Sequence, residues 1–98
     1  MGKIKVCVMA LYLSDEDYVP KLPVNKSLIA EYRVIPLRLF TEQSGRIVID
    51  RVKDIRRQAS LKAGGLGNRY TCLVTRGDVQ REIYLYKDED EWFMEEVI

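Results

Sequence analysis

The sequence predicts a mostly β protein, a small antiparallel meander or barrel of about six strands, for which the SH3-like barrel is the nearest common architecture. One observation is the alternation of apolar side chains at Tyr70, Cys72 and Val74, and again at Ile83 and Leu85. This period of two is that of a strand with one buried face. A second observation is the short turn sequences between such runs. Closing these strands into a barrel would remove the exposed sheet edges that invite aggregation.

The clearest signal is a meander from Asn68 to Val97. The sequence Arg76-Gly77-Asp78 predicts a hairpin turn in which glycine takes a positive φ. Lys87 to Glu91 is expected to form the next turn, and Trp92-Phe93-Met94 the last strand.

The first strand is expected in Lys3 to Leu13, where apolar residues occupy both alternating sets after Lys5. This pattern favours a central strand. Ser14 to Lys26 contains an acidic triplet and two prolines, which predict a loop because proline neither donates to a ladder nor continues a helix. Ser27 to Tyr32 is compatible with a helical turn or with the start of the next strand.

A second strand is predicted in Arg33 to Phe40. Its two alternating sets are Ile35, Leu37 and Leu39 on one face, and Val34, Pro36, Arg38 and Phe40 on the other. Pro36 within it indicates an edge position or a bulge, because proline has no N–H to give to a neighbouring strand. Thr41 to Gly45 has the composition of a turn, and Arg46 to Asp50 resumes the strand pattern.

The segment Asp50 to Ala63 admits two structures. Apolar residues at helical spacing and late cations favour an α+β alternative with a helix here. The β-branched residues just before it favour a strand to about Val52, then a second short strand or a helical turn to Leu61. Ala63 to Asn68 holds three glycines and predicts a loop or a bulged hairpin connection.

Length and composition indicate one domain over residues 1–98, with neither the high net charge of disorder nor the apolar run of a membrane helix. The first apolar run is too short for a signal peptide and is followed by acidic residues, so a cytoplasmic location is expected. Both cysteines, Cys7 and Cys72, lie in apolar runs and are expected to be buried free thiols.

Charge is unevenly distributed although the net charge is +1. Arg46 to Arg81 carries nine cations and three anions, whereas Glu82 to Ile98 carries seven anions and one cation. Attraction between the outer faces of adjacent strands explains this simply. The alternative is a basic surface for an anionic partner.

Several kinds of catalytic chemistry are excluded by composition. The chain has no histidine and no CxxC pair, which removes Ser-His-Asp and Cys-His catalysis and the common zinc sites. Its acidic residues cluster in predicted turns, where carboxylates keep ordinary pKa values. We therefore expect no enzyme activity, no cofactor and no metal site.

The sequence favours an accessory interaction module that binds a protein partner, or another copy of itself, through an uncovered sheet edge. The alternative is single-stranded nucleic-acid binding, with guanidinium groups on phosphates and exposed tyrosines such as Tyr84 and Tyr86 stacking on bases. No membrane partner is expected. The candidate anion-binding residues are Arg51, Lys53, Arg56, Arg57, Lys62 and Arg69.

Five short segments within Arg46 to Glu96, about half of the chain, resemble short uncharacterised proteins carried by bacterial mobile elements. The resemblance implies a bacterial origin and a conjugation or phage-like setting, and it carries over no activity, ligand or catalytic residue. The segments are Ile49-Asp50-Arg51-Val52, Ala59-Ser60-Leu61-Lys62-Ala63-Gly64-Gly65, Arg69-Tyr70-Thr71-Cys72, Tyr84-Leu85-Tyr86 and Trp92-Phe93-Met94-Glu95.

Overall fold

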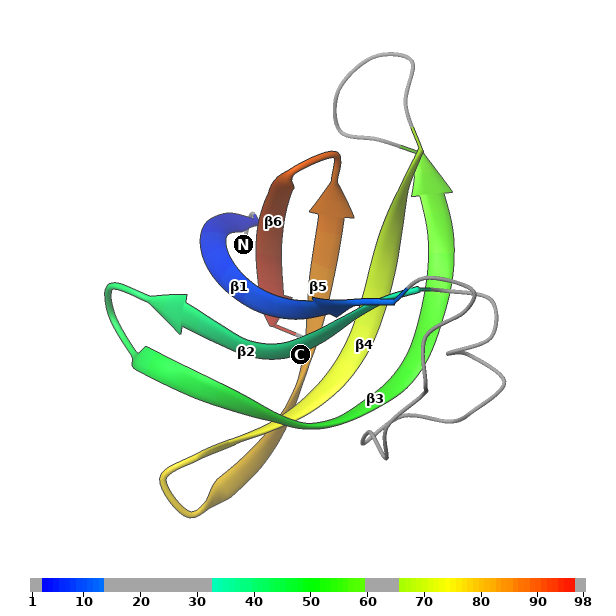
Figure 1. Ribbon diagram of the computed structural model, residues 1–98. Coiled ribbons are helices and arrows are strands. Elements are labelled where there is room, and N and C mark those ends of the chain that lie inside the picture. Colours follow the sequence, from blue (N-terminus) through cyan, green and yellow to red (C-terminus); the bar gives the residue numbers. More distant parts are fainter. Residues whose placement is uncertain (1–2, 14–32, 60–65, 97–98) are drawn as a thin grey trace.

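The computed structural model describes residues 3–13, 33–59 and 66–96, which form a closed antiparallel barrel (Figure 1). Each strand pairs with the next along the chain, and β1 pairs with β6 to close the barrel. The predicted antiparallel barrel of six strands is confirmed. The strands are β1 (Ile4–Tyr12), β2 (Val34–Thr41), β3 (Gly45–Ala59), β4 (Leu66–Arg76), β5 (Val79–Asp88) and β6 (Glu91–Glu96).

The meander formed by β4, β5 and β6 follows the predicted alternation. Tyr70, Cys72 and Val74 on β4, with Ile83 and Leu85 on β5, all lie inside the barrel and are at most 1% exposed. These residues bury one face of each strand, as period-two spacing requires.

The turn between β4 and β5 is also as predicted. Arg76 pairs with Val79, so the loop has two residues, and its first residue Gly77 has a φ of 65°. A positive φ at this position suits the right-handed twist of the flanking strands.

Strand β3 replaces the alternative helix over Asp50–Ala63, which is wrong for Asp50 to Ala59; the remaining residues of that segment lie outside the described ranges. The predicted break near Val52 is also wrong, because β3 is one strand of 15 residues. Its register against β4 shifts between Ile49 and Arg51 and again between Val52 and Asp54. Each bulge adds a residue and bends the strand. Figure 1 shows β3 curving from β2 toward β4.

Pro36 lies beside a bulge, as predicted. Met9 pairs with Arg38 and Ala10 with Pro36, so Leu37 is the extra residue on β2. The ladder between β2 and β3 begins only at Arg38. Pro36 therefore sits where β2 has a single paired neighbour within the described strands, and its missing N–H costs nothing there.

Strand β1 is paired on both sides, but over different residues. Ile4 to Val6 pair with β6, whereas Cys7 to Tyr12 pair with β2. The expected central position agrees with the pairing of β1 on both sides, but its outward side chains are exposed, because a barrel has one interior. The outward side chain of Cys7 is exposed, so the expected burial of both cysteines is correct only for Cys72.

Two predicted loops fall wholly or partly outside the described residues. Ser14 to Lys26 lies outside them, as does the ambiguous segment Ser27 to Tyr32. The glycine-rich stretch predicted as a loop ends earlier than expected, because Leu66 to Asn68 already belong to β4.

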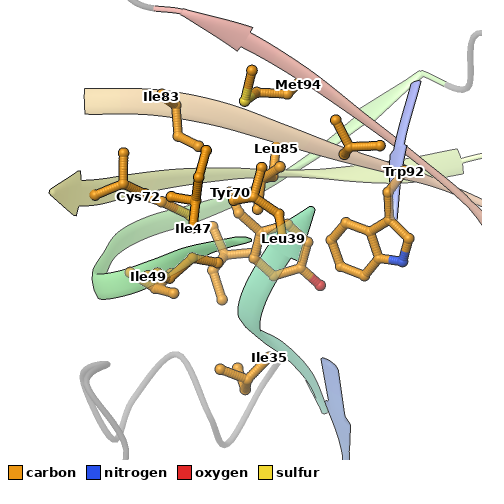
Figure 2. Packing of buried hydrophobic residues seen from close by; sticks show 14 residues of the cluster. Ile35, Leu39, Ile47, Ile49, Tyr70, Cys72, Ile83, Leu85, Trp92 and Met94 are labelled. Carbon is orange, nitrogen blue, oxygen red and sulfur yellow. The ribbon is translucent and has the colours of Figure 1, made fainter. Parts of the chain in front are cut away.

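The core fills the barrel interior with side chains from all six strands (Figure 2). The ring of Tyr70 lies 5.5 Å from that of Trp92, and the Tyr70 hydroxyl donates a hydrogen bond of 2.7 Å to the carbonyl of Val34. The hydroxyl of this fully buried side chain thus has a hydrogen-bond partner. The core residues are Val6, Ile35, Leu39, Ile47, Ile49, Val52, Ile55, Tyr70, Cys72, Val74, Ile83, Leu85, Trp92 and Met94.

Candidate binding surface

The basic residues predicted as an anion site do not all share one face. In the β3–β4 ladder Arg51 lies opposite Leu73 and Arg56 opposite Arg69, on the outer face. Arg57 lies opposite Asn68, whose amide donates to the Tyr70 hydroxyl at 3.4 Å, so Arg57 is on the interior side at one end of the barrel. Lys62 lies outside the described residues.

Two of the cations on the outer face form ion pairs with acidic side chains of the same chain. Lys53 Nζ lies 3.0 Å from Glu82 Oε1, and Arg56 Nε lies 2.7 Å from Asp54 Oδ2. The first pair reaches from β3 to β5 across β4. Exposed pairs of this kind contribute little to stability, about 0–1 kcal/mol each. The Lys53–Glu82 pair does join the basic segment to the acidic tail, but across an intervening strand, whereas both members of the Arg56–Asp54 pair lie in β3.

The tyrosines proposed to stack on bases are already in contact with cations of the same chain. Lys3 Nζ lies 4.4 Å from the centre of the Tyr86 ring, and Arg69 Cζ lies 4.8 Å from that of Tyr84. The expected exposure of Tyr86 is wrong, since it is 7% exposed and its hydroxyl donates to Glu95 Oε1 at 2.9 Å. Burial and this hydrogen bond raise the pKa of Tyr86 to about 12.

A second outer surface, on β1, β2 and β3, carries exposed apolar side chains. Met9 is 51% exposed, and Phe40 and Val48 are each 53% exposed. Cross-strand pairing sets the surface out as two rows. One row is Cys7, Phe40 and Arg46, the other Met9, Arg38 and Val48. We call these six residues the Met9/Phe40 face.

The Met9/Phe40 face carries positive charge. Its two cations, Arg38 and Arg46, form no ion pair within the part of the chain that the structure describes. None of its six residues is acidic. The face therefore combines apolar contact area with two guanidinium groups, which are the strongest planar donors to carboxylates.

A hollow of about 440 Å³ lies over this face. It is lined by Cys7, Val8, Met9, Arg38, Leu39, Phe40 and Arg46. An open hollow with an aromatic ring and two arginines suits a protruding group of a partner. It offers no acid–base pair, because none of its lining residues is an aspartate, glutamate or histidine.

Sequence reasoning missed the Met9/Phe40 face for an identifiable reason. Apolar residues in both alternating sets of Val6 to Leu13 indicated a central strand and drew no attention to an exposed face. In a closed barrel, however, the two alternating sets of a strand face the interior and the outside, so one of them must point outward.

The two thiols differ in a way that experiment can use. Burial raises the pKa of Cys72 from 9.0 to about 12, whereas Cys7 is exposed. We expect an aromatic disulfide reagent at neutral pH to modify Cys7 alone in the native protein and both thiols in denaturant. Reaction of both thiols in the native state at similar rates would contradict the buried position of Cys72.

Within residues 3–13, 33–59 and 66–96, no group of three or more Cys, Asp or Glu side chains is arranged to hold a metal ion. The same residues include no helix long and apolar enough to cross a bilayer. Comparison with known proteins gives no match to any family model, to any curated protein or to any solved structure.

Proposed function

We propose that this protein is a non-catalytic binding module that engages a protein partner through the Met9/Phe40 face. The observation that carries the proposal is the contiguous set of exposed Met9, Phe40 and Val48 beside Arg38 and Arg46, which form no ion pair with any other described residue. Aromatic residues, methionine and arginine are enriched in protein interfaces, where a few such side chains supply most of the binding energy.

The proposal is tested by selecting binders to the immobilised protein from a displayed library of random peptides. Such selections favour surfaces on which a few side chains dominate binding. We expect the enriched peptides to lose affinity by roughly tenfold or more when Met9→Ser and Phe40→Ser are combined. Alkylation of Cys7, which lies beside Phe40 in the ladder, should block the same peptides.

A matched control is Val79→Ser, because Val79 is 51% exposed, as is Met9, but lies on the β4–β5 hairpin. This variant should keep the affinity of the selected peptides. The proposal would be overturned if the selected peptides kept their affinity for the variant with Met9→Ser and Phe40→Ser, or if Val79→Ser lowered their affinity equally.

Single-stranded nucleic-acid binding through the outer face of β3 and β4 is the second candidate. It is favoured by the Arg69 Nε, which is buried on β4 opposite Arg56 and has no acceptor among the described residues. Binding of oligo-dT that falls steeply with salt and is lost in Arg51→Ala with Arg69→Ala would support it. Absence of binding at low salt would exclude it.

The setting we propose follows from the sequence. A small barrel with SH3-like connectivity, in the cytoplasm of a bacterium carrying a mobile element, agrees with the resemblance described above. The two cysteines are free, which is the usual state in a reducing compartment.

A further inference from the structure

We propose that the partner segment is an extended strand of alternating acidic and apolar residues, which pairs with β1 along Cys7 to Tyr12. This inference rests on the proposed function and specifies the chemistry of the partner. The strand would extend the sheet beside the Met9/Phe40 face, directing its carboxylates outward toward Arg38 and its apolar side chains toward the barrel end.

The edge of β1 supplies the pairing groups. Within the described strands, β1 pairs with β6 only over Ile4 to Val6, so Cys7 to Tyr12 have β2 as their one paired neighbour. In an antiparallel strand, alternate residues direct their N–H and C=O groups to opposite sides. Every second residue from Cys7 to Tyr12 thus presents a donor and an acceptor to an added strand, as in β-strand addition.

A side chain on the added strand can contact Arg38 across β1, because the barrel already contains an ion pair that spans one strand. An added strand would be separated from β2 by β1, which places it about 10 Å from β2. Lys53 on β3 and Glu82 on β5 are separated in the same way by β4, and their charged atoms meet at 3.0 Å. A glutamate on the added strand can therefore reach the Arg38 guanidinium over β1.

The opposite face of the added strand would meet apolar surface. Val8 and Ala10 on β1 pack against the core but are only partly buried. Apolar side chains on the added strand would cover them, while the acidic side chains lie on the outer face. Alternation of the two kinds of residue follows from the period of a strand.

Charge complementarity favours such a peptide over a second copy of this chain. Strand β1 has no acidic residue, so pairing β1 with β1 of another copy would join two outer faces that both carry Arg38 and Arg46. Unbalanced like charges across an interface are unfavourable. An acidic strand instead places carboxylates within reach of Arg38.

The test uses a fluorescent peptide of alternating glutamate and valine, compared with a block peptide of the same composition. We expect the alternating peptide to bind roughly tenfold or more tightly than the block peptide, as measured by anisotropy at low salt. Arg38→Glu with Arg46→Glu should reverse the preference toward an alternating lysine and valine peptide. Binding should also slow hydrogen exchange at every second amide between Cys7 and Tyr12.

The matched control is Arg81→Glu with Lys87→Glu, which makes the same change in net charge on β5, away from the face. It should leave the affinity unchanged. The inference would be overturned if the two peptides bound equally well, or if the control variant lost as much peptide affinity as Arg38→Glu with Arg46→Glu. Tighter binding of oligo-dT at the same face, or dimerisation through β1, would also overturn it. If selected peptides still depend on Met9 and Phe40 in those cases, the proposed function stands and only the strand chemistry is wrong.

Discussion

Tyr70→Ala should lower the free energy of unfolding by about 3–5 kcal/mol, the range for deleting a large aromatic side chain from a core. Tyr70 is 0% exposed and its ring packs on that of Trp92, so its removal would leave a cavity in the core. Chemical denaturation monitored by the fluorescence of Trp92 would measure the change. Total stability of a small domain is about 5–15 kcal/mol, so this variant should be close to unfolding.

Tyr70→Phe separates packing from hydrogen bonding at the same position. It keeps the ring and removes only the hydroxyl that donates to the Val34 carbonyl. The expected loss is about 1 kcal/mol, because the net value of such a bond is small although its buried acceptor is left unpaired. A loss in Tyr70→Ala no larger than that in Tyr70→Phe would show that the ring does not organise the core.

Gly67→Ala should destabilise the barrel by about 1–3 kcal/mol, the range for forcing extra atoms into a packed site. A Cβ at Gly67 would lie 2.5 Å from the carbonyl oxygen of Lys87, which belongs to the backbone of β5 and cannot swing aside. The two strands would have to separate at the end of the ladder where Asn68 pairs with Lys87. Thermal unfolding of the variant and the wild type would measure the effect.

Gly45 provides the control for that prediction. It has a φ of 67° and no atom within 4 Å of an added Cβ, so its requirement is conformational and not steric. Asparagine tolerates this conformation. Gly45→Asn should therefore cost little, whereas Gly67→Asn should cost as much as Gly67→Ala. A larger loss of stability in Gly45→Asn than in Gly67→Asn would show that the close approach of β4 and β5 at Gly67 does not limit stability.

The meander could be predicted from the sequence because its apolar residues keep a period of two, which is broken only near the end of β5, where Tyr86 and Asp88 are also buried. Tyr70, Cys72 and Val74 retain a period of two with no bulge in the β4–β5 ladder. Strand β3 could not be predicted in this way. Its two bulges space the buried residues Ile49, Val52 and Ile55 three apart, which resembles the spacing of a helix.

The candidate site was harder to predict for the same reason. Arg56 and Arg57 lie next to each other in the sequence and face opposite sides of the barrel, which follows at once from a strand and not from a helix. Exposure of Met9 and Phe40 depended on barrel closure, which no local pattern specifies. The distribution of charge in the sequence indicated a binding surface on β3 and β4. Two cations of that surface, Lys53 and Arg56, already pair with Glu82 and Asp54.

The joining of β1 to β6 has a consequence for synthesis in the cell. These two strands meet through three residue pairs, Ile4 with Met94, Lys5 with Phe93 and Val6 with Trp92. Contacts between segments so far apart along the chain carry a large loop-closure cost and form late. As the nascent polypeptide leaves the ribosome, Ile4 to Val6 of β1 lack their pairing partner until β6 has emerged. During that interval these residues are accessible to chaperones.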